Sequence, residues 1–298
     1  MKKFKRLVMA DNTGIKEFAG EELSELADEV IFYDDFPDGV QAVTERIRDA
    51  DAVLVSWNTG IGAEILSQCR ALEYIGLCCT FFGEKSCNVD AAYCREKGIE
   101  VRGVSHYGDY GVVEYVFSEL IRMVKGLGSI SFYPEQRELR GMKLGIIGLG
   151  TVGAMIADTG AFFGMDVSYH NRREKPDCPY TYKDKETLLR ESDVILTSIP
   201  RNQTVVENDD FAGLDTHKIF INVGVGPSFG QTGFEQWIER GGYAILDYGS
   251  VYDERRDWYG AQERISLSGR VAGFTCNARM RLAEKAVNNI KDYLTSVY

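Results

Sequence analysis

The sequence lacks any apolar run long enough to cross a lipid bilayer, because its longest apolar stretches have only the length of a β-strand. We also expect no signal peptide, since the basic start MKKFKR is followed only by the short apolar stretch LVMA before Asp11 and Asn12. We therefore expect a cytoplasmic protein. Of the 298 residues, 44% are hydrophobic and 27% are charged, which indicates a globular chain long enough for two domains.

Paired metal-binding motifs are absent as well. The stretch from Cys78 to Cys94 is rich in cysteine, but it contains no CxxC pair and no histidine lies near it in the sequence. Zinc sites need such spacing. Seven cysteines in a chain of this length, without a secretion signal, fit a reducing compartment better than a disulfide framework. We expect mostly buried thiols and no metal site.

An excess of positive charge is also missing. Lysine and arginine number 34 against 45 aspartates and glutamates, so the formal net charge is -11. A protein of this sign repels phosphate backbones, which argues against nucleic acid as a general partner. Local basic groups can still hold a small anion. We expect a small-molecule, anionic substrate, with neither nucleic acid nor a membrane as partner.

Short apolar runs alternate with helix-length amphipathic segments along the chain, which predicts an α/β protein with parallel sheets covered on both faces. The first expected strands are RLVMA, EVIFY, AVLVSW, LEYIGLC and IEVRGV. A helical stretch over 112–125 and an irregular segment, GLGSISFYPEQRELRG, follow them. The second expected strands are MKLGIIG, DVSYHN, DVILTSI, KIFINVG, YAILDYG and ISLSG, before a final helix over 279–293 that is free to return to the first domain.

The second series opens with the strongest motif of the sequence. GIIGLGTVG places Gly148, Gly150 and Gly153 in a GxGxxG pattern between an apolar strand and an alanine-rich helix. The first glycine permits a tight turn, the second lets a pyrophosphate approach the backbone, and the third lets helix and strand pack closely. The N-terminus of the helix supplies N–H groups to the phosphates. The motif predicts a dinucleotide site.

The next strand ends at the position that meets the adenosine ribose. Sites that prefer NAD usually carry Asp or Glu there, whereas this chain has Asn171, Arg172 and Arg173. Two guanidinium groups can pair with a 2'-phosphate, so NADP(H) is favoured over NAD(H). A basic turn that only faces solvent is the alternative interpretation.

These motifs together resemble the D-2-hydroxy acid dehydrogenase family, which includes formate, glycerate and phosphoglycerate dehydrogenases. Besides RGMKLGIIGLGTVG, the resemblance is carried by CNVDAAYCREKGIEV, SIPRNQTVV, KIFINVGVGP, AILDYGS and SGRVAGFT, and it covers essentially all 298 residues. It implies two doubly wound parallel-sheet domains with the active site in the cleft between them. The flavodoxin-like substrate domain would comprise 1–103 and 276–298, and the Rossmann dinucleotide-binding domain 104–275.

The resemblance also implies cofactor contacts beyond the glycine motif and the basic turn. Asp247 matches the family aspartate beside the nicotinamide amide, and Asp193 is expected near the same side of the sheet. The remaining implied contacts are Thr151, Val152, Ser198, Ile199, Pro200, Thr204, Val223, Gly224, Val225, Arg270 and Gly273. The family usually dimerises through this domain, so we expect a homodimer, although the segment before the glycine motif is short and lacks the family's tryptophan.

The sequence departs from the family at all three catalytic positions. Val225 stands where an arginine normally binds the substrate carboxylate. Ser250 stands nearest to the glutamate that orients the catalytic histidine, with Asp253 and Glu254 slightly beyond. Arg270 stands where the histidine itself donates the proton. A guanidinium group cannot donate a proton near neutral pH, because its pKa is above about 12.

Arg270 has three possible roles at this position. It can bind an anionic substrate through a bidentate contact, it can reach the cofactor, or it can pair with a carboxylate such as Asp253. Two other residues are candidate replacements on the opposite wall of the cleft. Lys85 lies in the lengthened, aromatic stretch CCTFFGEKSC, and His106 lies on the loop VSHYGDYG, although a loop histidine is more often an ordinary surface residue.

Two classes of function fit this sequence. In the first, the protein is an NAD(P)-dependent oxidoreductase with a rebuilt active site and a non-standard substrate, for which Arg270, His106 and Lys85 are the candidate catalytic residues. In the second, it is a non-catalytic relative that binds a dinucleotide and acts as a sensor or assembly partner. The pocket is remodelled rather than deleted, and this favours the enzyme.

Overall fold

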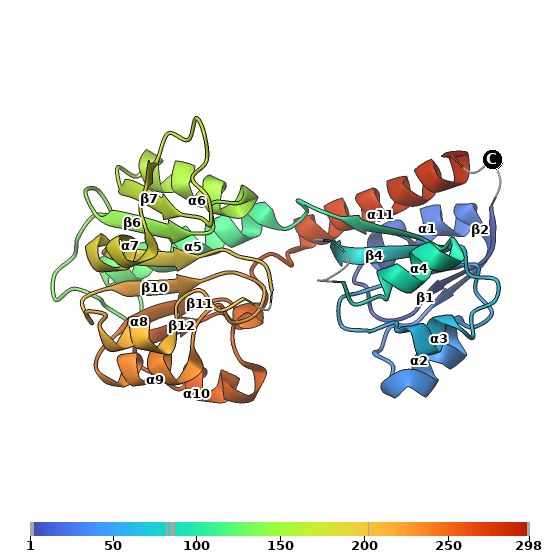
Figure 1. Cartoon of the computed structure of the whole chain (residues 1–298), viewed down its shortest axis with the longest axis horizontal. Helices are drawn as coiled ribbons and strands as arrows, with labels where there is room; N and C mark the ends of the chain where they lie inside the picture. Colours follow the sequence, from blue (N-terminus) through green and yellow to red (C-terminus); the bar gives the residue numbers. More distant parts are fainter. Residues whose placement is uncertain (1–2, 82, 84–86, 202, 297–298) are drawn as a thin grey trace. The chain divides into compact units, whose positions relative to one another are not determined.

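The computed structural model describes residues 3–81, 83, 87–201 and 203–296. The chain forms two compact units, each built around its own parallel sheet (Figure 1). Unit 1 comprises Met1–Tyr107 and Thr275–Tyr298, and unit 2 comprises Gly108–Phe274. Within the described residues, no helix combines the length and the apolar character that a membrane crossing requires.

Unit 1 contains a five-stranded sheet of order β2-β1-β3-β4-β5, in which all described pairings are parallel. Its strands are β1 (Phe4–Met9), β2 (Ala27–Phe32), β3 (Ala52–Val55), β4 (Tyr74–Thr80) and β5 (Glu100–Val104). Its helices are α1 (Lys16–Leu26), α2 (Gly39–Ile47), α3 (Ala63–Leu66), α4 (Ala91–Lys97) and α11 (Cys276–Ser296). The prediction of a covered parallel sheet is therefore confirmed for this unit.

The central strands of this sheet are buried on both sides, and apolar side chains therefore cover both of its faces. Residues of β1 that point one way, such as Leu7, pack with the buried face of α11, including Leu282 and Ile290. Residues that point the other way, such as Val8, pack with Val43 of α2. Alternation within a single apolar run thus supplies two cores, as expected for a doubly wound sheet.

Unit 2 contains a seven-stranded parallel sheet of order β12-β11-β10-β9-β6-β7-β8. Its strands are β6 (Lys143–Ile147), β7 (Asp166–His170), β8 (Thr181–Tyr182), β9 (Val194–Thr197), β10 (Ile219–Asn222), β11 (Tyr243–Leu246) and β12 (Ile265–Leu267). Its α-helices are α5 (Asp109–Lys125), α6 (Thr151–Phe162), α7 (Lys185–Glu191), α8 (Asn208–Ala212), α9 (Gln231–Glu239) and α10 (Arg256–Gly260), and two short 3₁₀ turns, η2 (Tyr248–Ser250) and η3 (Asp253–Arg255), precede α10.

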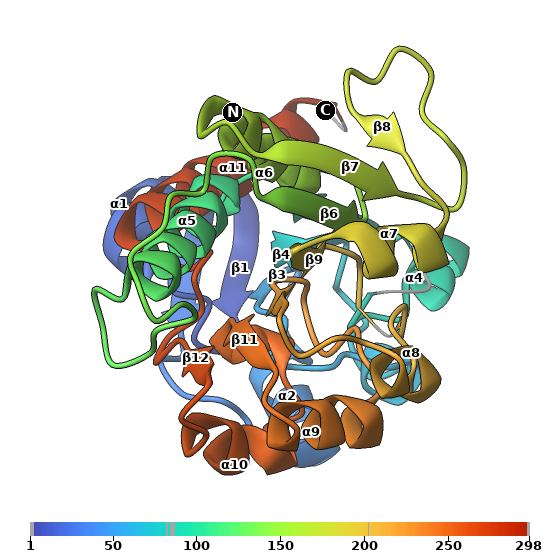
Figure 2. The ribbon, with the colours of Figure 1, turned by 90° about the vertical axis from the view of Figure 1, so that its left-hand side faces the viewer.

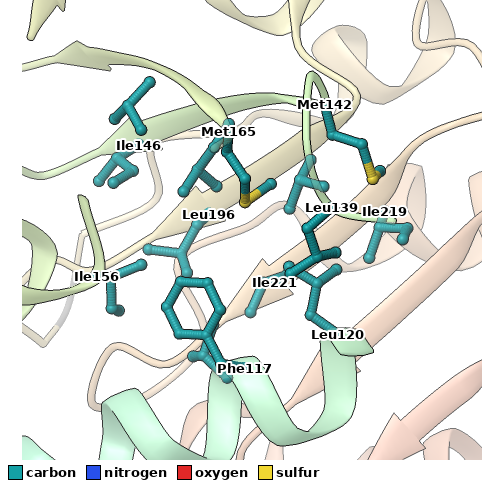
Figure 3. Close-up of a cluster of buried hydrophobic side chains, with 14 of the residues drawn as sticks. Phe117, Leu120, Leu139, Met142, Ile146, Ile156, Met165, Leu196, Ile219 and Ile221 are labelled. Atoms are coloured by element: carbon teal, nitrogen blue, oxygen red, sulfur yellow. The ribbon is translucent and has the colours of Figure 1, made fainter. Parts of the chain in front are cut away.

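The core between this sheet and helices α5 and α6 holds the second unit together (Figure 3). Phe117 and Leu120 of α5 and Ile156 of α6 face Leu196 and Ile221 of the central strands (Figure 3). Each of these side chains is almost fully removed from water, and burial of one such side chain contributes about 1.5–3 kcal/mol. This packing fixes the strand that ends at the glycine motif.

Candidate dinucleotide site

The loops after β6 and β9 flank the topological switch point of the second sheet. From β6 the chain continues outward to β7 and β8, whereas β9 lies on the other side of β6 and continues to β10, β11 and β12. In open α/β sheets, ligands bind at the carboxyl ends of the strands beside this point. Gly148 follows β6 and Ser198 follows β9, so both predicted loops lie at this place.

The three motif glycines differ in what surrounds them. A Cβ at Gly148, which has a φ of +101°, would lie 2.3 Å from the Ser198 carbonyl oxygen. A Cβ at Gly153 would lie 2.2 Å from the Gly148 carbonyl oxygen. A Cβ at Gly150 would meet nothing within 4 Å. The first and third glycines are therefore required by the fold, whereas the space beside Gly150 is open to a ligand.

The N-terminus of α6 faces this open space with unused donors. Gly150 is the N-cap and carries no side chain to cap the helix, and the first intrahelical bond runs from the Ala154 N–H to the Gly150 carbonyl at 2.9 Å. The N–H groups of Thr151, Val152 and Gly153 consequently have no acceptor inside the helix. Such a terminus attracts the negative charge of a phosphate.

Asn171 is tied to the glycine loop rather than left free. Its Oδ1 accepts a hydrogen bond from the Leu149 N–H at 2.8 Å. The amide nitrogen, which is a donor, makes no hydrogen bond to the described residues and is free to meet a ligand. Arg172 and Arg173 follow on an exposed loop, and within the described part of the chain neither guanidinium makes a hydrogen bond or an ion pair.

The loop after β10 is held by a buried asparagine. Asn222 donates from Nδ2 to the Ser250 carbonyl at 2.7 Å, and its Oδ1 accepts from the hydroxyls of Thr197 and Ser228 at 2.9 and 3.0 Å. This amide joins the loops after β9, β10 and β11. The position that the resemblance gives to a carboxylate-binding arginine is Val225, whose side chain is apolar and 39% exposed.

Ser250 has a structural role in this fold. Its side chain is fully buried, and its hydroxyl lies 2.8 Å from both the Asn222 and the Asp247 carbonyl oxygens. It therefore offers no acid that could orient a proton donor. Asp253 forms an ion pair with Arg256, three residues away, and not with Arg270. In the described structure, Arg270 therefore does not pair with Asp253, which leaves two of its three possible roles.

Asp247 organises the loop that carries Arg270. Only 5% exposed, its Oδ1 accepts from the Ala272 N–H at 2.8 Å and from the Ser268 hydroxyl at 3.0 Å. Burial raises the pKa of this carboxyl above its usual value, and the hydrogen bonds partly offset that effect. The Ser268 hydroxyl also lies 2.7 Å from the Arg270 carbonyl oxygen. Two backbone groups of the loop, the Arg270 carbonyl and the Ala272 N–H, are therefore fixed.

The Arg270 side chain itself is exposed. Among the described residues, no hydrogen bond or ion pair engages its guanidinium. The next residue, Val271, lies close to Gly249 in the loop after β11, because a Cβ at Gly249 would lie 3.6 Å from a Val271 methyl group. Arg270 thus stands on a fixed loop at the carboxyl end of β12, with its charge available to an anion.

The remaining predicted cofactor residues lie mainly in the same row of loops. Gly224 and Ile199 are adjacent, because a Cβ at Gly224 would lie 2.9 Å from the Ile199 carbonyl oxygen. Val223 is buried in the core, Pro200 and Thr204 are exposed, and Gly273 packs against the start of α5 near Val112.

The other three sequence-predicted residues are His106, Lys85 and Asp193. His106 belongs to unit 1, is exposed and has a φ of +58°, and the next residue, Tyr107, accepts from Arg281 Nε at 2.8 Å. Lys85 lies outside the described residues. The expectation for Asp193 is wrong: it precedes β9, and its carboxylate accepts from the Lys143 N–H at the amino end of β6, the end opposite the glycine loop.

Sequence reasoning missed Ser268 and Asn222, which fix the loops after β12 and β10. Both are polar residues at the carboxyl end of an apolar strand, and this position was the available signal. Within the described ranges, no group of three or more His, Cys, Asp or Glu side chains is arranged to hold a metal ion.

Comparison with known proteins agrees with this geometry. Residues 123–248 match the model of the D-isomer specific 2-hydroxyacid dehydrogenase NAD binding domain. A hydroxypyruvate reductase of Blautia hydrogenotrophica is 25% identical over 283 residues, covering 86% of this chain and 85% of the relative. A glyoxylate/hydroxypyruvate reductase of Arabidopsis thaliana is 24% identical over 265 residues, covering 82% of each chain.

Solved structures share the fold over almost the whole length. D-lactate dehydrogenase from Aquifex aeolicus, complexed with NAD and lactic acid, has a TM-score of 0.81 at 21% identity and covers 98% of this chain and 96% of its own. An acyclic imino acid reductase in complex with NADPH and D-Arg has a TM-score of 0.83 at 22% identity, covering 98% and 97%. The predicted pair of doubly wound parallel-sheet folds is therefore confirmed.

Proposed function

Because residues 123–248 match the D-isomer specific 2-hydroxyacid dehydrogenase NAD binding domain, we propose that the chain is an NAD(P)-dependent oxidoreductase of that family, acting on a small anionic substrate other than a simple 2-hydroxy acid. The observation that carries this proposal is a complete dinucleotide loop, together with an unpaired Arg270 at the position that the sequence resemblance gives to the proton donor. The first feature retains the redox partner. The second changes what the site can recognise and protonate.

The residues of the switch point suit a nicotinamide dinucleotide. Gly150 leaves room for the pyrophosphate, and the free N–H groups of α6 would bind its oxygens. The loops that contain Ile199 and Gly224 would line the nicotinamide half, with Asp247 holding the Arg270 loop behind them. When bound, the cofactor supplies or accepts a hydride. The chain's own residues position it and select the substrate.

The ribose position favours the phosphorylated cofactor. The acceptor of Asn171 is already used by Leu149, so the side chains there offer an amide donor and two guanidinium groups. A 2'-hydroxyl finds no carboxylate acceptor, whereas a 2'-phosphate finds several donors. We therefore propose NADP(H) as the preferred cofactor.

Calorimetry should show that NADPH binds more tightly than NADH, and that the difference disappears when Arg172 and Arg173 are both changed to Ala. We expect NADPH affinity to fall roughly 10- to 100-fold, the scale of one lost charged hydrogen bond, which contributes about 1.5–3 kcal/mol. NADH affinity is the internal control and should stay nearly constant. Equal affinities in the unmodified protein would contradict the preference.

Arg270 is proposed to bind the anionic group of the substrate. Its guanidinium is exposed and unpaired among the described residues, and Asp247 and Ser268 fix its backbone. On a protein of net charge -11, a local cation would be a main attraction for an anion. His106, which belongs to unit 1, and Lys85, which lies outside the described residues, remain candidate replacement acids in this proposal.

Arg270→Ala should weaken the binding of oxalate, used as a small anionic probe with NADPH at saturation, by about 1–3 kcal/mol, or roughly 5- to 150-fold. The melting temperature should not change, because the side chain makes no described contact. Arg264→Ala is the matched control, since Arg264 is also exposed but precedes the same strand, at its opposite end. If the two substitutions weakened oxalate binding equally, a specific role of Arg270 in anion binding would be refuted.

We also propose that the protein is a homodimer, joined through unit 2. Phe162 at the end of α6 is 83% exposed. Its ring makes an edge-to-face contact with Phe163, which in turn contacts Phe117 of α5. An exposed aromatic group on a core-forming helix is typical of a surface that another chain covers.

A further inference from the structure

The loop that carries Arg172 and Arg173 is exposed yet anchored at two points, Asn171 and Lys175. This segment, residues 171–180, joins β7 to β8 and projects from the sheet as a long loop (Figure 2). At its start, Asn171 is held by the Leu149 N–H through its side chain and by the Tyr182 hydroxyl, at 3.3 Å, through its carbonyl oxygen. The two arginines follow directly.

The second anchor is a tyrosine of the core. Tyr169 lies in β7 with 0% of its surface exposed, and its ring packs edge-on against Tyr182. Its hydroxyl accepts from the Lys175 N–H at 2.9 Å and lies 3.5 Å from the Lys175 carbonyl oxygen. Lys175 is two residues beyond Arg173. One buried hydroxyl thus contacts both backbone groups of a single loop residue.

We propose that Tyr169 is a positioning residue for cofactor selectivity, whose hydroxyl holds the turn that presents Arg172 and Arg173 to the 2'-phosphate of NADP(H). The inference rests on the proposed preference for NADP(H). Without the anchor at Lys175, the loop would have to be ordered when the cofactor binds, and that loss of conformational freedom reduces affinity. NADH, which lacks the phosphate, would not require the ordered turn.

Phenylalanine at this position isolates the hydroxyl from the ring. Burial raises the pKa of the Tyr169 hydroxyl, so it stays protonated near neutral pH. Tyr169→Phe keeps the apolar ring within the core and removes the hydroxyl's contacts to the loop, which are those to Lys175 and to the Cys178 thiol. Lys175 is exposed and can bond to water instead. The substitution therefore acts on the loop and spares the sheet.

Calorimetric titration of the full chain with NADPH and with NADH tests the inference. Tyr169→Phe should lower NADPH affinity by about 3- to 10-fold, as expected for one lost hydrogen bond, and should change NADH affinity by less than about twofold, within the spread of a neutral substitution. Amide hydrogen exchange over residues 171–177 should become faster. Tyr243→Phe is the matched control, because Tyr243 is a half-buried strand residue whose hydroxyl makes no hydrogen bond to the described residues, and it should change neither affinity.

The results separate the two proposals. If Arg172→Ala with Arg173→Ala removes the NADPH preference but Tyr169→Phe leaves it intact, the positioning role is overturned and the cofactor preference stands. An equal loss of NADPH and NADH affinity also overturns the positioning role. Equal affinities in the unmodified protein overturn both proposals. If Tyr169→Phe does not fold, Lys175→Pro removes the same N–H from the exposed side and should lower NADPH affinity selectively.

Discussion

Glyoxylate, pyruvate and hydroxypyruvate, each supplied with NADPH, are expected to show no useful turnover with this protein. A positioned general acid contributes roughly 10²- to 10⁴-fold to a carbonyl reduction. The position that the sequence resemblance gives to the proton donor holds an arginine, which does not release a proton near neutral pH. Val225 offers no charge to the substrate carboxylate, and the Ser250 hydroxyl is committed to backbone carbonyls. We expect rates at least about a thousandfold below those of an intact site.

The assay follows NADPH absorbance, with calorimetric binding of NADPH to the same preparation as the control for a folded site. Arg270→His alone should not restore turnover, because Val225 still cannot hold a carboxylate. Adding Val225→Arg to Arg270→His should give more activity than either single change, since binding and protonation would then act together. Robust activity of the unmodified protein on any of the three acids would mean that Val225, Ser250 and Arg270 do not occupy the positions assigned to them.

The sheets and the glycine loop could be predicted from the sequence because their signals are local. An apolar run followed by GxGxxG and an alanine-rich segment constrains strand, turn and helix within a short window. The backbone explains why the pattern is strict at two of its positions, since any side chain at Gly148 or Gly153 would collide with a carbonyl oxygen. No other part of the chain would have to be known to make this prediction.

The contacts around Arg270 could not be predicted in the same way, because their partners lie far apart in the sequence. Asp247 meets Ala272, and Asn222 meets Ser250, only once the order of strands β10, β11 and β12 is fixed. For Asp193, the sequence-based expectation chose the wrong end of the sheet. An aspartate beside an apolar run has a different meaning at each end of a parallel strand, and the sequence alone did not distinguish the two ends.

Asn171 and Tyr169 show how a side chain can be correctly located and still be incompletely understood. The sequence predicts Asn171 at the ribose position. The structure adds that its Oδ1 accepts from the Leu149 N–H, whereas its Nδ2 makes no hydrogen bond to the described residues. Tyr169 has the pattern of an ordinary core residue, and its contact with Lys175 depends on the path of a loop with no regular structure. The cofactor selectivity that we propose would therefore depend on backbone geometry that residue types do not reveal.

Gly150→Val is expected to abolish the binding of both NADPH and NADH while leaving the fold intact. Gly150 has a φ of -79° and a ψ of -158°, which any residue can adopt, and a Cβ there would meet no protein atom within 4 Å. The same space is where a pyrophosphate must approach the backbone. A branched side chain should therefore exclude the cofactor and cost at least about 2.7 kcal/mol, or roughly 100-fold in affinity.

Calorimetry with both cofactors and thermal unfolding of the free protein measure the two halves of this prediction. Gly213→Val is the matched control, since Gly213 also has a negative φ, of -91°, and a Cβ there would likewise meet no atom within 4 Å, but it lies at the end of α8. The control should keep both the melting temperature and cofactor affinity. If Gly150→Val binds NADPH and NADH as tightly as the unmodified protein, the dinucleotide does not lie over this loop, and the function proposed from it fails with it.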